Sequence, residues 1–202
     1  MFDPQTEHHY QAAYTMVAGG VFGDATQTKN KYEQKHVVRG NDELIARTPG
    51  LVWRKTSVTG FLPESNEITL SDGSKHSYDI LVVNPGLSLR FDQIKGAQEA
   101  LDDPDTPVGS MYYLEGAYKT SLMREAFNGG NAIFTCPKFP IKCGGAPQKI
   151  LYLSEETFRK NGVRDRTNMR YYAAPPIMFP PNDDFNEVLN KTCIDKGIEQ
   201  FF

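Results

Sequence analysis

The sequence predicts an α/β fold, because short apolar runs alternate with stretches of helical pattern. The run at 132–134 is typical of a buried strand, and a helix with apolar side chains at helical spacing begins at Pro147. A second strand is expected at 167–173. Residues 67–78 contain two short strand-like runs around a Ser-Asp-Gly turn, which indicates a β-hairpin. The chain therefore combines strand–helix–strand units with a small antiparallel element.

Further elements are expected on both sides of these segments. The apolar run 78–86, which ends at Gly86, suits a buried parallel strand. Helices are predicted at 113–127 and after a cap at Asn182 or Asp183, and a strand at 198–202. The side chains expected to face the core are Leu114, Tyr118, Leu122 and Phe127 in the first helix and Phe185, Val188, Leu189 and Ile194 in the second.

Composition excludes several classes of protein. The 202 residues suffice for one large domain or two small ones, and a net charge of −3 gives no electrostatic case for nucleic-acid binding. No apolar run approaches the roughly 18 residues that a membrane helix needs. The 3 cysteines show neither zinc nor disulfide-scaffold spacing, so no metal is predicted. The first ten residues contain no Lys or Arg, so we expect no targeting leader there.

Cys143 is the candidate catalytic residue. It lies in a turn-rich segment just before the helix that begins at Pro147. Unpaired backbone N–H groups and the positive end of a helix dipole favour a thiolate at such a position, and Lys142 and Lys149 add positive charge nearby. The alternative is an inert loop cysteine, which is the commoner case for a single cysteine.

The surrounding residues resemble the first redox-cysteine segment of the mitochondrial type of sulfide:quinone oxidoreductase. This flavoprotein family belongs to the glutathione-reductase-like superfamily, and its segment reads F-P-x-x-P followed by K-C-x-G-A-P-Q-K. The matching residues are Pro137, Pro140, Lys142, Cys143, Gly145, Ala146, Pro147, Gln148 and Lys149. The resemblance implies that Cys143 carries a persulfide during turnover.

The fold that this resemblance implies is a three-layer FAD/NAD(P)-binding fold, incomplete at both ends, with a small antiparallel β-meander. Residues 1–127 would form a partial FAD-binding domain that lacks the first βαβ unit. Residues 128–202 would form a partial second nucleotide-binding-like domain that carries the redox cysteine. The chain would thus correspond to an interior fragment of the family.

The resemblance also implies four FAD-binding residues. Asp3 would accept a hydrogen bond from the adenosine ribose, Gln11 would contact the flavin, Val58 would meet the adenine end, and Gly86 would allow close backbone approach to the flavin. Asp3 could instead cap a turn, and Val58 could be an ordinary strand residue. The glycine fingerprint G-x-G-x-x-G, which cradles a pyrophosphate, does not occur in the sequence, so we expect weak FAD binding by this chain alone.

The activity implied is oxidation of hydrogen sulfide, with electrons passing through FAD to a quinone such as ubiquinone and sulfur leaving on glutathione or sulfite. The implied location is mitochondrial, at the inner membrane, with membrane contact only through a C-terminal part of the family. Weak or no activity is expected of these residues alone. Alternatives are a non-catalytic remnant or binding module of the same fold, or an NADH dehydrogenase of the superfamily. Cys136 and Cys193 are expected to be structural.

Overall fold

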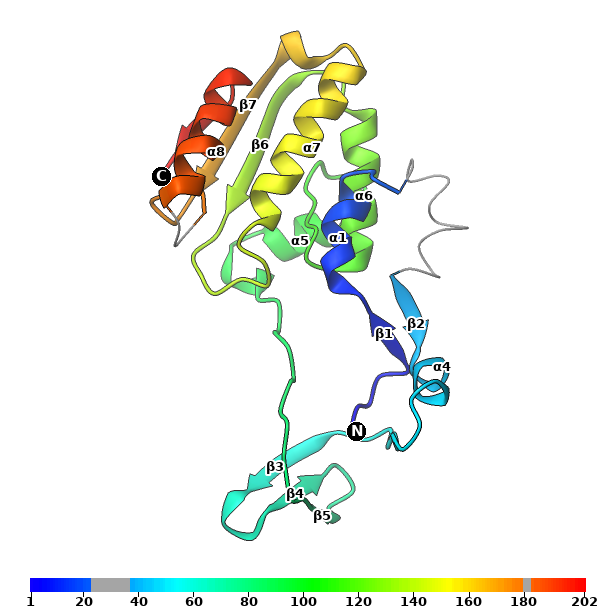
Figure 1. Ribbon diagram of the computed structural model, residues 1–202. Coiled ribbons are helices and arrows are strands. Elements are labelled where there is room, and N and C mark those ends of the chain that lie inside the picture. Colours follow the sequence, from blue (N-terminus) through cyan, green and yellow to red (C-terminus); the bar gives the residue numbers. More distant parts are fainter. Residues whose placement is uncertain (23–36, 180–182) are drawn as a thin grey trace. The chain divides into compact units, whose positions relative to one another are not determined.

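The computed structural model describes residues 1–22, 37–179 and 183–202 (Figure 1). The described residues form two compact units, one made of 1–10 and 37–88 and the other of 11–22, 89–179 and 183–202. The sequence analysis predicted a boundary between two cofactor-binding domains after residue 127, and the cofactor roles of these domains stay a prediction. The compact units divide the chain elsewhere, because a helix that precedes residue 127 packs on a helix that follows it.

The first unit is built from small antiparallel sheets. Strand β1 (Glu7–His9) pairs with β2 (Val38–Gly40), which leads into helix α4 (Asn41–Ala46). The predicted hairpin is confirmed as part of a three-stranded antiparallel meander, in which η2 (Pro63–Ser65) connects the first two strands. Its strands are β3 (Val58–Leu62), β4 (Glu67–Leu70) and β5 (Lys75–Ser77). Ile68 and Leu70 of the central strand are buried.

The strand predicted at 78–86 is wrong. Residues 79–90 adopt no strand, and the side chains of Ile80 and Val82 are 85% and 75% exposed. Apolar content alone predicted burial there, but a strand also needs a neighbour that accepts and donates its backbone hydrogen bonds. None of the strands in the described ranges pairs with this segment.

The second unit contains a parallel sheet. Its strands are β6 (Gly130–Cys136), β7 (Thr167–Ala173) and β8 (Glu199–Phe201), paired in that order. Helix α7 (Ala146–Lys160) and the short η4 (Arg164–Arg166) connect the first pair of strands, and helix α8 (Asp183–Asp195) precedes the last strand (Figure 1). This alternation confirms the predicted α/β class.

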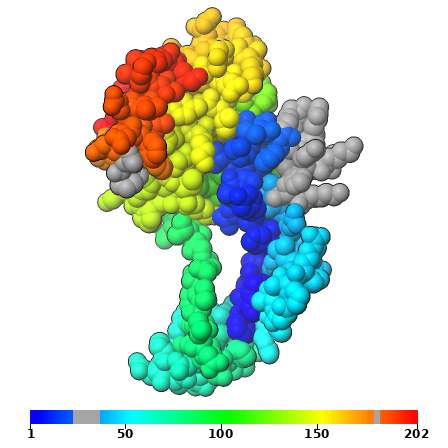
Figure 2. Space-filling view, in the orientation of Figure 1, coloured from blue at the N-terminus to red at the C-terminus, as the bar shows by residue number. Residues whose placement is uncertain are grey.

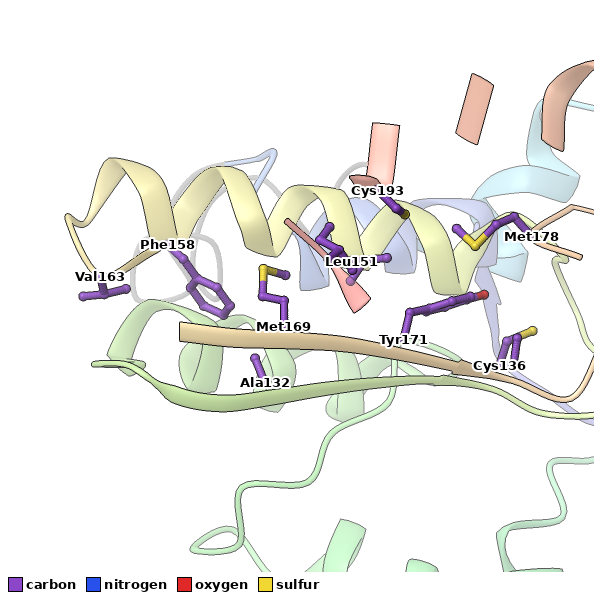
Figure 3. Packing of buried hydrophobic residues seen from close by; sticks show 11 residues of the cluster. Ala132, Cys136, Leu151, Phe158, Val163, Met169, Tyr171, Met178 and Cys193 are labelled. Carbon is purple, nitrogen blue, oxygen red and sulfur yellow. The ribbon is translucent and has the colours of Figure 1, made fainter. Parts of the chain in front are cut away.

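The main core lies between α7 and this sheet. Leu151 and Phe158 point from α7 towards Met169 and Tyr171 of β7 (Figure 3). The helical pattern predicted an apolar face of four residues, of which Ile150, Leu151 and Phe158 are buried and Leu153 is partly buried. Side chains spaced along one face of an amphipathic helix thereby cover the sheet, and their removal from water stabilises the unit.

A second layer of helices packs beside α7. Helix α1 (Tyr14–Ala18), which follows η1 (Gln11–Ala13), contacts both α6 (Leu114–Ala126) and α7, and in Figure 2 its blue surface adjoins that of the rest of the unit. The shorter η3 (Phe91–Gln93) and α5 (Ala97–Asp102) lie in the segment before α6. Within the described residues, no helix is long and apolar enough to cross a membrane.

The faces predicted for α6 and α8 are wrong at half of their positions. The predicted residues that are partly buried are Leu114, Tyr118, Phe127 and Leu189, and the last two pack against the main core. The buried residues of α6 are Gly116, Ala117, Ser121 and Arg124, whereas Leu122 is 49% exposed. Helix α6 packs on α1, and Arg124 donates a hydrogen bond to the Ala18 carbonyl oxygen at 3.1 Å. In α8 the residues Phe185, Val188 and Ile194 are exposed, and the buried residues are Asn186 and Cys193.

Candidate functional site

Cys143 lies in the segment that connects β6 to α7. Its carbonyl oxygen accepts a hydrogen bond from the backbone N–H of Ala146, the first residue of α7, at 3.1 Å. Pro147 occupies the first turn of that helix, where a missing N–H costs no helical hydrogen bond. The predicted position of Cys143, immediately before a helix, is therefore confirmed. Its side chain is exposed and forms no disulfide.

The other two cysteines, which the structure also describes, are enclosed. Cys136 and Cys193 are buried and free. Burial raises the pKa of both thiols, and the Sγ of Cys193 lies 3.5 Å from the Tyr152 hydroxyl. A buried thiol that stays protonated is a poor nucleophile. Of the three cysteines, Cys143 is the one placed to react with a solute.

Residues 137–145, which connect β6 to α7, are called the cysteine segment below. Lys142 connects this segment to the start of η1. Its Nζ donates to the side-chain carbonyl oxygen of Gln11 at 2.8 Å and to the backbone carbonyl of Tyr112 at 3.3 Å. Burial lowers the pKa of Lys142. The structure thus brings together Gln11 and Cys143, two of the residues singled out from the sequence, by way of a lysine that lies beside the thiol in the chain.

Tyr112 is a site residue that the sequence analysis missed. Its hydroxyl donates to the carbonyl oxygen of Cys143 at 3.3 Å. Burial, followed by the charges of Cys136 and Cys143, raises its pKa, so the hydroxyl keeps its proton and remains a donor. The two residues are 31 positions apart, and no local pattern in the sequence connects them.

Three of the predicted cofactor residues lie in the other compact unit. The Oδ1 atom of Asp3 accepts the backbone N–H of Gln5 at 2.9 Å, which is the turn-capping alternative. Val58 opens β3 opposite Leu70. Gly86 has a φ of 77°, and a Cβ built there would meet no described atom within 4 Å. Their role in binding FAD stays a prediction.

An apolar cavity of about 830 Å³ lies beside β6 and α6. Among the described residues that line it are Met111, Met123, Phe127 and Ile133, but not Cys143. The described ranges contain no group of three or more His, Cys, Asp or Glu side chains arranged to hold a metal ion.

The curated proteins to which this chain is similar include several that carry the same name. The chain is 38% identical over 201 residues to the mitochondrial sulfide:quinone oxidoreductase of Dictyostelium discoideum. The aligned region covers 99% of this chain and 41% of that protein. It is 34% identical over 177 residues to the mouse protein of the same name, covering 88% of this chain and 36% of the relative. The chain thus spans about two fifths of the length of these relatives. No protein-family model matches the sequence.

Comparison with solved structures shows the fold. The sulfide:quinone oxidoreductase of Aquifex aeolicus superposes with a TM-score of 0.72 at 18% identity, over 99% of this chain and 43% of that one. NDH2 of Plasmodium falciparum superposes with a TM-score of 0.60 at 9% identity, over 99% and 41%. The chain therefore shares the α/β fold of part of these oxidoreductases.

Proposed function

We propose, on the premise that this chain is a relative of the mitochondrial sulfide:quinone oxidoreductases, that Cys143 is the residue at which sulfide is oxidised. The observation that supports this role is the position of the thiol. It is exposed at the start of α7, while both other thiols of the chain are buried. The same exposure lets hydrosulfide reach Sγ from solution.

The chemistry proposed at Cys143 is a two-electron oxidation. The Cys143 thiolate and a hydrosulfide ion join through one new S–S bond, one proton is released, and two electrons leave, so the product is a persulfide anion. Sulfite or glutathione then removes the outer sulfur; with sulfite the products are thiosulfate and the regenerated thiolate. Such exchange needs an accessible nucleophilic sulfur and a good leaving thiolate.

FAD, when bound, would supply the acceptor for the two electrons. The residues present fit parts of this cofactor. The Gln11 amide and the Lys142 ammonium are hydrogen-bond donors beside the cysteine segment and suit carbonyl oxygens of a flavin ring. Asp3 uses Oδ1 for the Gln5 amide, and a carboxylate can accept further bonds, such as those from a ribose. Val58 and the open backbone at Gly86 complete the proposed set.

The whole activity belongs to a longer protein than these residues represent. Electrons would pass to a quinone such as ubiquinone, and the location would be the mitochondrial inner membrane, as the names of the relatives suggest in part. Because the chain covers only 41% of the Dictyostelium protein, we expect weak or no quinone reduction from the 202 residues alone.

A chimera tests the proposal. The 202-residue chain would replace the matching portion of the Dictyostelium relative, and retained flavin absorbance would report that the chimera folds. We expect sulfide-dependent quinone reduction by the chimera and its loss in Cys143→Ser, because serine cannot form the S–S bond. Cys136→Ala is the matched control and should keep the activity, since that thiol is buried.

A flavin-retaining chimera without sulfide oxidation would contradict the proposal and favour a non-catalytic module. Equal activity in Cys143→Ser and its parent would exclude this cysteine as the site of reaction. Quinone reduction by the 202-residue chain alone would contradict the expectation that the remaining length is needed.

A further inference from the structure

Tyr112 contacts the cysteine segment through both its backbone and its side chain. Its backbone carbonyl accepts the Nζ of Lys142 at 3.3 Å, and its hydroxyl donates to the carbonyl oxygen of Cys143 at 3.3 Å. Tyr112, which precedes α6 in the chain, therefore holds two consecutive residues of the cysteine segment, Lys142 and Cys143.

The need for such an anchor follows from the exposure of the segment. Residues 137–140 are exposed, and so is the side chain of Cys143, whereas 145–148 are buried at the start of α7. Exposed backbone with few packed neighbours opens readily. Two further bonds complete the arrangement: Lys142 to Gln11 at 2.8 Å and the Ala146 N–H to the Cys143 carbonyl at 3.1 Å. These four hydrogen bonds are called the cysteine clamp below.

The hydroxyl of Tyr112 is suited to remain in the clamp while the thiol changes charge. Burial raises the pKa of Tyr112, and a negative charge on Cys143 raises it further, so the hydroxyl keeps its proton when the thiolate forms. Its bond runs to a backbone carbonyl, which leaves the sulfur lone pairs available for attack.

We propose that Tyr112 is a positioning residue for Cys143, which fixes the backbone of the cysteine segment so that the thiol meets sulfur donor and acceptor in one geometry. This rests on the proposed function for the sulfur chemistry, but the hydrogen bonds are a property of the fold. A group held in place before the reaction loses less freedom in reaching the transition state.

The test compares Tyr112→Phe, which deletes only the hydroxyl, with Tyr113→Phe, whose ring packs against Phe91. Cys143 is loaded with sulfur from inorganic polysulfide, in which the thiolate takes one sulfur atom and a shorter polysulfide leaves. The persulfide is then discharged by sulfite, and the appearance of thiosulfate is timed. Amide hydrogen exchange of Ala146 is measured in the same proteins.

In Tyr112→Phe we expect about five-fold faster exchange at the Ala146 amide and about five-fold slower discharge of the persulfide by sulfite. A factor of about five corresponds to the free energy of one lost hydrogen bond. The Tyr171 amide in β7 should gain at most the same factor, because the lost bond also lowers the stability of the folded state against global unfolding. Tyr113→Phe should match the unsubstituted chain in all of these measurements.

Unchanged exchange at Ala146, or discharge as fast as in the unsubstituted chain, would overturn the inference. Faster exchange at Tyr171 without a change at Ala146 would assign Tyr112 to general stability and would also overturn it. If the unsubstituted chain takes up no sulfur, the proposed function fails, and the Ala146 and Tyr171 exchange rates still decide whether Tyr112 holds the segment.

Discussion

Truncation of Leu151 to alanine should lower the free energy of unfolding by about 3 kcal/mol, within the usual range for a leucine removed from a packed core. Leu151 is 0% exposed and lies in the cluster between α7 and the sheet, near Met169 and Tyr171 (Figure 3). The loss combines apolar area returned to water with a cavity that rigid neighbours fill only partly. Urea denaturation followed by circular dichroism measures it.

Leu122→Ala is the matched control for this truncation. It removes the same atoms from α6, where the side chain is 49% exposed, and it should change stability by no more than about 0.5 kcal/mol. Similar losses in the two variants would show that the core does not lie between α7 and the sheet. A chain without a cooperative transition would favour the alternative of a non-catalytic remnant.

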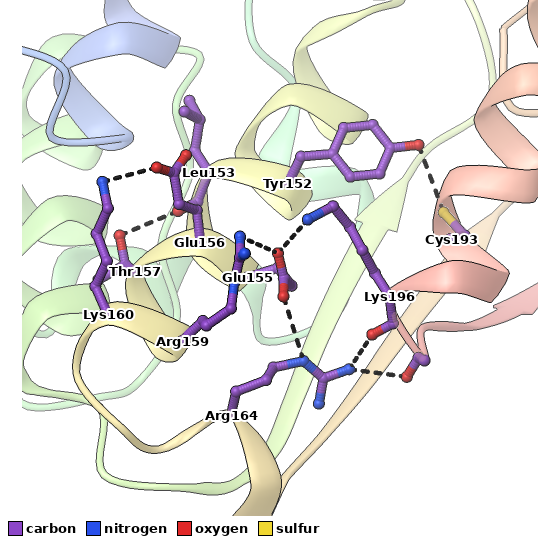
Figure 4. A network of polar contacts seen from close by, with 11 residues as sticks. Tyr152, Leu153, Glu155, Glu156, Thr157, Arg159, Lys160, Arg164, Cys193 and Lys196 are labelled. Atoms are coloured by element: carbon purple, nitrogen blue, oxygen red, sulfur yellow. Dashed lines mark hydrogen bonds and ion pairs between the residues drawn. The ribbon is translucent and has the colours of Figure 1, made fainter.

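Neutralising Glu155 should also be costly, by about 2 kcal/mol. Its side chain is 5% exposed and accepts Lys196 Nζ at 2.5 Å and Arg159 Nη2 at 3.5 Å, with Arg164 Nε at 3.8 Å (Figure 4). Arg164 in turn donates to the backbone carbonyls of Lys196 and Gly197. The carboxylate thus ties α7 to the end of α8, and Glu155→Gln leaves cations without their anion.

The effect should stay below that of a fully buried pair, because Lys196 is partly exposed and solvent screens its charge. Glu156→Gln is the control: this neighbour is 48% exposed and pairs with Lys160 along the helix, so a much smaller loss of stability is expected than for Glu155→Gln. The urea midpoints of the two variants make the comparison. Equal midpoints would mean that the Glu155 network adds nothing to stability.

The parts of the fold that the sequence predicted well are those governed by local rules. The strands β6 and β7 and the helix α7 follow from an apolar run, a proline at a helix start and apolar residues at helical spacing. Because these patterns act within about 15 residues, they also placed Cys143 correctly at the end of the connecting segment.

The failures share a different cause, since each depends on a neighbour distant in sequence. The segment 79–90 is apolar but has no paired strand in the described part of the chain. The buried face of α6 is decided by α1, whose carbonyl at Ala18 receives Arg124 from 106 positions away. The contact of Lys142 with Gln11 spans 131 positions, so the polar surroundings of the thiol could not be predicted.

The central claim is that Cys143 is the sulfur-carrying residue, and the most direct test is to locate sulfur on the chain itself. After brief treatment with inorganic polysulfide, mass spectrometry of peptides would compare the three cysteines. We expect one added sulfur atom on Cys143, removed by sulfite, with Cys136 and Cys193 unmodified because both are buried. Sulfur on either buried cysteine in preference to Cys143, or no sulfur on any of them in the folded chain, would contradict the claim.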